Sequence, residues 1–298
     1  MSEIDLFPGF ERRFLTVDGI RLFARIGGSG PPLVLVHGFP QTHVEWHRIA
    51  GPLARDFQVV ALDLRGYGDS DVPASHKGEG YSKRVMARDV VGAMAALGHE
   101  KFHYVGHDRG ARVGYRLALD APQTLIKLAV LDIVPTESMW SGMDASRAMN
   151  VYHWMFLAQR EPMPETLIGG APRFYADHTL ASWTKTADLS AFGPPHALEA
   201  YRRQFDEPSR IHAFCEDYRA GATIDLALDR ADLAAGRTIA TPLLALWGAV
   251  GIPSQGASPL DIWRRWAPNA HGRAIDCGHF LPEEAPEATL AALQDFLR

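Results

Sequence analysis

Short apolar runs alternate with longer amphipathic stretches over most of this chain of 298 residues, and this alternation narrows the folds that are open to it. The runs are brief and rich in Val, Leu and Ala, as in strands that are buried on both faces of a parallel sheet. They are residues 33–36, 58–64, 102–105, 128–134, 243–247 and 273–275. The stretches with helical spacing are residues 82–97, with Ser82 as the expected N-cap, 111–119 and 286–297. Strand and helix in alternation predict an α/β fold with a doubly wound sheet.

One segment of about 100 residues, from Pro135 to Gly236, breaks this alternation. It has no run that resembles a buried strand, and it is rich in aromatic side chains. We expect a helical insertion between the strand that ends near Val134 and the strand that begins at Leu243. An insertion at this point would lie over the carboxyl edge of the sheet, where open α/β folds bind ligands. The predicted domains are a core of residues 1–134 and 237–298 and a helical cap of residues 135–236.

Charge and cysteine content argue against several classes of protein. The chain has 30 Lys and Arg against 35 Asp and Glu, a net charge of −5 with no block of like charge, so nucleic-acid binding is not expected. No apolar run approaches the roughly 20 residues of a membrane span, and the acidic N-terminal residues lack the pattern of a signal peptide. Cys215 and Cys277 cannot build a disulfide framework and have no zinc-site spacing. We therefore expect a soluble, cytoplasmic protein without a membrane partner.

The pentapeptide Gly106-His107-Asp108-Arg109-Gly110 lies between a predicted strand and a predicted helix. Small flanking residues in this context permit a sharp turn that projects one side chain above the sheet, as in the turn that carries a catalytic nucleophile. The pattern is weak by itself, because an Asp that caps a helix would give the same letters.

A second loop has the form of half an oxyanion hole. His37-Gly38-Phe39-Pro40 directly follows the predicted strand 33–36. The backbone amide of Phe39, together with that of Arg109 after the nucleophile, would then stabilise an oxyanion. We expect the His37 and His107 side chains to support these two loops rather than to perform chemistry.

A histidine and an aspartate complete the predicted catalytic set. His279 follows the last predicted strand, and Asp132 ends the strand at 128–131, from where it can orient the imidazole. The loop 248–258 contains no carboxylate that could replace it. We therefore predict Asp108, Asp132 and His279 as the catalytic residues.

An aspartate nucleophile suits displacement at a saturated carbon, which leaves an alkyl ester on the enzyme. Halides and epoxides are the two obvious electrophiles, and His279 would activate the water that hydrolyses the ester. Arg109 adjoins the nucleophile and Arg112 lies one helical turn away, so two guanidinium groups could hold a planar carboxylate. The alternative is that they pair with structural acids.

Taken together, these motifs resemble the α/β-hydrolases with an aspartate nucleophile, and among them the haloacetate (fluoroacetate) dehalogenases. The matching segments are residues 5–10, 37–43, 277–284 and, most specifically, 107–112. The resemblance implies a mostly parallel eight-stranded sheet flanked by helices, with an inserted helical cap. It also implies a homodimer that hydrolyses a small anionic haloacid, as small as haloacetate, without a cofactor.

The resemblance further implies a halide pocket in the inserted segment. His153, Trp154 and Tyr218 match its hydrogen-bond donors, and Trp183 and Tyr152 are expected to line the pocket. Tyr152 and Tyr218 could instead protonate an epoxide oxygen, although the related epoxide hydrolases typically have Trp where this chain has Arg109. An epoxide hydrolase is therefore the first alternative, and a binding protein without turnover is the second.

No metal is expected. His43 and His47 have helical i, i+4 spacing, but no third ligand suggests itself.

Overall fold

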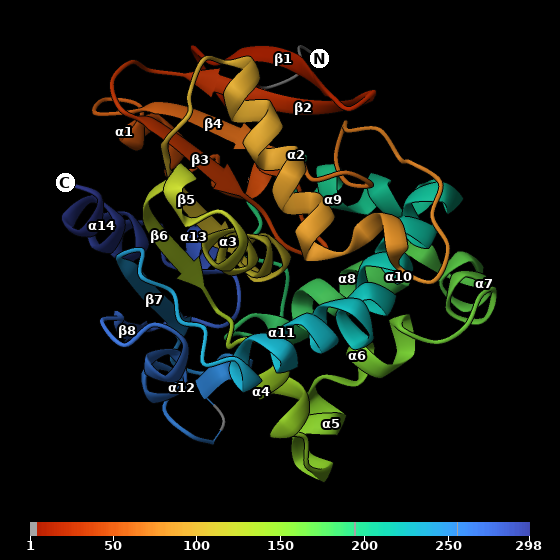
Figure 1. The fold of residues 1–298 in the computed structure, drawn as a ribbon. Helices are drawn as coiled ribbons and strands as arrows, with labels where there is room; N and C mark the ends of the chain where they lie inside the picture. The colour runs from red at the N-terminus through yellow and green to blue at the C-terminus, as the bar shows by residue number, and fades with distance from the viewer. Residues whose placement is uncertain (1–4, 194, 255) are drawn as a thin grey trace.

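The computed structural model describes residues 5–193, 195–254 and 256–298, and it shows one sheet of eight strands (Figure 1). The strand order is β1-β2-β4-β3-β5-β6-β7-β8. The bounds are β1 (Glu11–Val17), β2 (Ile20–Gly27), β3 (Pro32–Val36), β4 (Gln58–Leu62), β5 (Phe102–His107), β6 (Leu125–Leu131), β7 (Leu243–Gly248) and β8 (His271–Ile275). The pairs β1·β2 and β2·β4 are antiparallel, and the pairs from β4 to β8 are parallel. The predicted α/β class with a mostly parallel sheet is confirmed.

The central strands are apolar throughout because both of their faces are covered. Val34 and Val36 of β3 belong to one core cluster, whereas Leu33 and Leu35 belong to the other, as the alternation of side chains along a strand requires. The first cluster includes side chains of α2 (Lys83–Ala96), α3 (Asp108–Asp120) and α12 (Pro259–Trp266). The second includes side chains of α1 (Ala50–Leu53), α13 (Leu281–Glu284) and α14 (Pro286–Leu297). Helices therefore lie on both faces of the sheet (Figure 1).

The described residues of the segment between β6 and β7 form helices and the turns that connect them. Its helices are α4 (Thr136–Ser141), α5 (Ala145–Asn150), α6 (Tyr152–Leu157), α7 (Met163–Gly170), α8 (Pro172–Trp183), α9 (Pro195–Arg202), α10 (Pro208–Ala222) and α11 (Ile224–Ala234). They gather on one side of the sheet, beyond the ends of β5 and β6 (Figure 1). Nowhere in the described part of the chain is a helix long and apolar enough to cross a membrane.

Several element bounds differ from the sequence prediction. The strand β1 was not predicted, because it lies at the sheet edge and buries only Leu15 and Val17. Its antiparallel partner β2 was not predicted either. Helix α3 begins at Asp108 rather than at residue 111, directly after β5. Strand β6 ends at Leu131 rather than at residue 134, and β4 ends at Leu62 rather than at residue 64. Ser82 caps α2 as predicted, since its side chain accepts a hydrogen bond from the amide of Val85.

Candidate active site

Asp108 lies at the sharp turn where β5 becomes α3. Its φ of 41° is in the left-handed region that non-glycine residues rarely adopt, and such strain concentrates at functional sites. The turn packs tightly on β3, because a Cβ added to Gly110 would lie 2.1 Å from the carbonyl oxygen of Val36. The Asp108 side chain is thereby fixed at the carboxyl end of the sheet, where it is buried but lines a cavity.

The loop after β3 contacts this carboxylate. The amide of Phe39 donates a hydrogen bond to Asp108 Oδ2 at 3.0 Å. Arg109 is the second residue of α3, so its amide is among the N-terminal donors that have no acceptor within a helix. The structure thus places the Phe39 amide on the Asp108 carboxylate, and the Arg109 amide directly follows Asp108 at the start of α3.

His279 and Asp132 form a short hydrogen bond. The Nδ1 atom of His279 lies 2.6 Å from Asp132 Oδ2, and Asp132 Oδ1 accepts a hydrogen bond from the amide of Gly248 at 2.8 Å. This arrangement favours the tautomer with a proton on Nδ1, which leaves the Nε2 atom of His279 as a base. Within the described residues that Nε2 atom is buried and has no hydrogen-bond partner.

The electrostatic surroundings keep Asp108 ionised. Burial alone would raise the pKa of Asp108, but His279, Arg109 and Arg112 hold that pKa below its ordinary value.

His107 directly precedes Asp108 in the chain and is charged. It donates hydrogen bonds to Glu45 Oε2 at 3.1 Å and to the carbonyl of His279 at 2.9 Å. Burial opposes a charge on His107, yet Glu45 raises the pKa of His107 to about 9. Glu45 was missed by the sequence analysis because only its spatial neighbours reveal its role.

Arg109 is held in a buried ion network. Its Nη2 and Nε atoms donate to Asp217 Oδ1 at 2.6 and 3.1 Å, and its guanidinium carbon lies 4.2 Å from the centre of the Tyr218 ring. Asp217 also binds the Lys83 ammonium group and accepts a hydrogen bond from the Tyr67 hydroxyl at 2.8 Å. This guanidinium therefore has a carboxylate partner within the protein, from helix α10.

Arg112 is in a different situation. It is buried, and its Nη1 atom donates to the carbonyl of Val134 at 3.0 Å and to Thr136 Oγ1 at 3.1 Å, both neutral acceptors. Its Nε atom is buried and has no hydrogen-bond partner in the part of the chain that the structure describes, and its guanidinium carbon lies 4.6 Å from the Trp154 ring centre. In ranges 5–193, 195–254 and 256–298, no carboxylate oxygen lies within 4.0 Å of its nitrogen atoms. Among the described residues Arg112 is thus a buried cation without an ion pair at contact distance, although the ionised Asp108 attracts it from further away.

Asp108, Arg112 and His279 line one small cavity. The volume open to the centre of a water-sized sphere is about 20 Å³, so that only a ligand of a few atoms fits without movement. The lining residues are Asp108, Arg112, Asp132, Ile133, Val134, Met139, His153, Trp154, Trp183, Ile252, Pro253 and His279.

The predicted halide donors lie at or near this cavity. His153 and Trp154 of α6 line it, and the buried Tyr218 of α10 has its ring centre 5.7 Å from that of His153. Burial lowers the pKa of His153 to about 3, so its imidazole is neutral. Trp183 also lines the cavity, but Tyr152 does not; it is 38% exposed, because its neighbour His153 takes the inward-facing side of α6.

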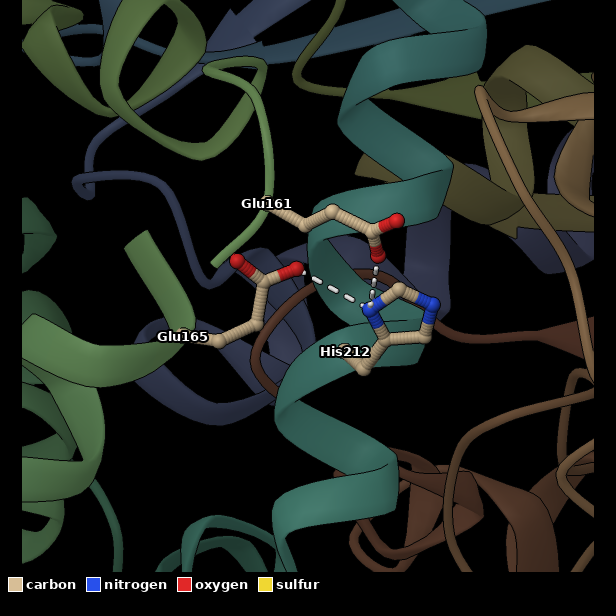
Figure 2. Close-up of side chains that lie close together, drawn as sticks. All are labelled: Glu161, Glu165 and His212. Atoms are coloured by element: carbon tan, nitrogen blue, oxygen red, sulfur yellow. Dashed lines mark hydrogen bonds and ion pairs between the residues drawn. The ribbon is translucent and has the colours of Figure 1, made fainter. Parts of the chain in front are cut away.

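A separate cluster has ligand atoms close enough for a metal ion. In Figure 2 the side chains of Glu161 and Glu165 point toward His212 Nδ1, at 3.7 and 3.0 Å. Arg219 also donates to the same oxygen of Glu165 at 2.8 Å, so ion pairs account for this arrangement without a metal. The sequence candidates His43 and His47 do not converge, since His43 Nδ1 contacts Asp63 and His47 Nδ1 contacts the carbonyl of Val44.

Comparisons with known proteins agree with this architecture. A model of the alpha/beta hydrolase fold family matches residues 31–286. A fluoroacetate dehalogenase from Burkholderia sp is 42% identical over 98% of this chain and 95% of its own length. A soluble epoxide hydrolase from Corynebacterium sp. (strain C12) is 32% identical over 91% of each chain. The crystal structure of a candidate alpha/beta hydrolase from Nostoc sp PCC 7120 has a TM-score of 0.93 and 51% identity, with 97% of this chain and 98% of that one covered. The chain therefore belongs to the alpha/beta hydrolase fold family.

Proposed function

We propose that this protein hydrolyses a haloacetate, fluoroacetate or chloroacetate, to glycolate and halide through a covalent ester on Asp108. The observation that carries the proposal is Arg112, a buried guanidinium group that forms no carboxylate ion pair within the described residues and lines a very small cavity beside Asp108. A buried cation is unfavourable unless it is paired, so this site favours a ligand that brings its own negative charge.

The reaction would proceed in two steps. An oxygen of Asp108 attacks the carbon that bears the halogen, the carbon–halogen bond breaks, and the halide leaves with the electron pair. The Nε2 atom of His279, oriented by Asp132, then removes a proton from water, which attacks the carbonyl carbon of the Asp108 ester. The amides of Phe39 and Arg109 stabilise the resulting oxyanion. As the oxyanion collapses, the bond from the Asp108 carbonyl carbon to the glycolate oxygen breaks, His279 returns its proton to that oxygen, and Asp108 loses its remaining proton to solvent and is again a carboxylate.

Two sets of polar groups would orient the substrate. Arg112, with Arg109 beside it, would hold the substrate carboxylate. His153, Trp154 and Tyr218 would donate hydrogen bonds to the departing halide. The neutral His153 has a buried Nδ1 atom that meets no hydrogen-bond partner among the described residues. Burial raises the pKa of Tyr218 well above its ordinary value, so this phenol keeps its proton for donation. The relative from Burkholderia sp, named a fluoroacetate dehalogenase, supports this assignment.

An epoxide hydrolase is the second candidate, because the soluble epoxide hydrolase from Corynebacterium sp. (strain C12) matches along most of the chain. The same three catalytic residues could open an epoxide. However, Tyr152 is exposed and lies outside the cavity lining, whereas Tyr218 is buried, and a neutral epoxide would bring no anion to Arg112. A binding protein without turnover is a weaker alternative, since the hydrogen-bonded set around His279 is complete.

The test compares halide release from fluoro-, chloro- and bromoacetate with hydrolysis of styrene oxide, using Asp108→Asn as the blank. We expect halide release from at least one haloacetate and none from the blank. Turnover of the epoxide alone would refute the proposal and favour an epoxide hydrolase. A haloacetate that binds but is not converted would favour a binding protein.

We also propose, from the family resemblance, that the protein is a cytoplasmic homodimer. Light scattering on the purified protein measures the mass directly, and a monomer at micromolar concentration would contradict the dimer.

A further inference from the structure

The loop that carries His279 is held by one carboxylate. Glu284, the last residue of α13, accepts hydrogen bonds from the amides of Gly278 and Phe280, each at 2.9 Å, with its two different oxygen atoms. These two amides flank His279 in the chain. A carboxylate that accepts backbone hydrogen bonds on both sides of a residue fixes the backbone of that residue more tightly than neutral acceptors would.

The same carboxylate reaches the inserted helical segment. Glu284 Oε2 accepts a third hydrogen bond, at 2.7 Å, from the amide of Lys185, just after α8. The two segments pack closely, because a Cβ added to Gly278 would lie 2.5 Å from the carbonyl oxygen of Trp183. That carbonyl also accepts a hydrogen bond from the amide of His279 at 2.9 Å. Glu284 therefore joins the His279 loop to the corner that presents Trp183 to the cavity.

Glu284 does not line the cavity, so it can act only through the groups that it holds. Its effect should fall on His279, whose Nδ1 atom must stay 2.6 Å from Asp132 while Nε2 meets a water beside the ester. General-base catalysis depends on such placement, since small misalignments of a catalytic group weaken it strongly.

We propose that Glu284 is a positioning residue for the general base His279 and that it acts selectively on the hydrolysis of the ester intermediate. This inference rests on the proposed function. In that mechanism the first step, alkylation of Asp108, needs no base, whereas the second step does. A residue that only positions His279 should therefore influence the second step alone.

The experiment measures the two steps separately with chloroacetate. Rapid-quench halide release gives the rate of alkylation, and mass spectrometry of the quenched protein follows formation and decay of the carboxymethyl ester on Asp108. In Glu284→Ala we expect alkylation within about twofold of the unsubstituted protein and ester hydrolysis slowed about tenfold to hundredfold, a part of the 10²–10⁴-fold that a general base contributes. Glu284→Gln, which keeps one carbonyl acceptor, should lie between the two.

Matched controls separate position from general damage. Glu287→Ala removes an exposed carboxylate in the first turn of α14, and Asp276→Ala removes the exposed ion pair with Lys185 in the same loop. Both should hydrolyse the ester at the unsubstituted rate. Thermal unfolding of every variant identifies any that is not folded, in which case Glu284→Gln supplies the comparison.

A double substitution provides the decisive outcome. In a His279→Asn background the general base is absent, so adding Glu284→Ala should change ester hydrolysis by less than about twofold. A further large loss in that background, or equal slowing of both steps in Glu284→Ala alone, would show a merely structural role and overturn the inference. An ester that accumulates in His279→Asn but not in Glu284→Ala or Glu284→Gln would overturn the positioning role only. No ester in His279→Asn would refute the covalent mechanism and the positioning role with it.

Discussion

Replacement of Arg112 by Leu should remove most of the discrimination for a carboxylate substrate. The guanidinium group is buried, and among the described residues its two hydrogen bonds are to neutral oxygens, so a bound carboxylate would be its ion-pair partner. Removing one member of a buried, hydrogen-bonded charge pair costs about 2–5 kcal/mol. Since about 1.4 kcal/mol corresponds to a tenfold change in rate, kcat/KM for chloroacetate should fall roughly 30-fold to 5,000-fold.

The matched substrate is chloroacetamide, which has nearly the same size and the same reacting carbon but no charge. Its kcat/KM should change by less than about tenfold in Arg112→Leu, because the guanidinium group has no anion to bind in that complex. Arg112→Lys keeps the charge but not the planar fork, and we expect it to recover only part of the chloroacetate activity. Steady-state halide release measures kcat/KM of the unsubstituted protein and of both variants with each substrate.

Equal losses for chloroacetate and chloroacetamide would refute this reasoning. They would show that Arg112 supports the shape of the cavity through its contacts with Val134 and Trp154 rather than binding a carboxylate. The proposed substrate class would then lose the observation on which it depends.

The remaining predictions concern the catalytic set and the buried charges. Asp108→Asn should abolish turnover, and His279→Asn should accumulate a carboxymethyl ester on Asp108 that intact-protein mass spectrometry detects; persistent turnover in either would contradict the assigned roles. Asp217→Asn should lower the free energy of unfolding in urea by about 3–5 kcal/mol, because it leaves Arg109 without its buried carboxylate and Lys83 with only the longer pair to Asp225, at 3.5 Å. Asp276→Asn, at an exposed pair, should lower it by less than about 1 kcal/mol. The pKa of His107 is about 9 in the folded state against 6.5 ordinarily, so its contribution to stability, on the order of 3 kcal/mol, should be complete below about pH 6.5 and lost as the pH rises through about 9. In His107→Gln this decline should be absent, and an unchanged decline would assign it to another group.

The sequence predicted the parts of the fold that depend on local pattern. Buried parallel strands leave continuous apolar runs, and α2 has both an amphipathic face and the Ser82 cap, so these elements were found. Strand β1 was not predicted because an edge strand with mostly exposed residues has no continuous apolar run. Strand β2 is recognisable only through its antiparallel pairing with β1. The start of α3 was placed too late because a helix that opens at Asp108 with a positive φ has no ordinary N-cap signal.

Site residues could be predicted from the sequence where the order of strands determines their place. They could not be predicted where contacts between distant segments determine it. Asp108, Asp132 and His279 all follow strands of one sheet, and the topology alone brings their side chains to the same edge. The ion network of Arg109 with Asp217 and Lys83 joins α3, α10 and α2. These residues are far apart in the sequence, and their spacing does not predict the network. Tyr152 could not be separated from its neighbour His153 either, since the rotation of α6 on the cavity is set by tertiary packing.

Arg109 and Arg112, the predicted carboxylate-binding pair, show that the ion-pair partners of each charged side chain must be identified before a substrate is inferred. Both lie in the first turns of α3 and both are buried. The sequence pattern alone therefore predicts the same role for both. Asp217 neutralises Arg109 whether or not a ligand is present, and a substrate carboxylate would have to share that guanidinium group with it. Among the described residues Arg112 has only neutral hydrogen-bond acceptors, and Asp108 attracts it from beyond contact distance, so an anion that enters the cavity would supply the ion pair that Arg112 lacks. The binding of a carboxylate should therefore depend more strongly on Arg112 than on Arg109, although Arg109 is the residue adjacent to the nucleophile.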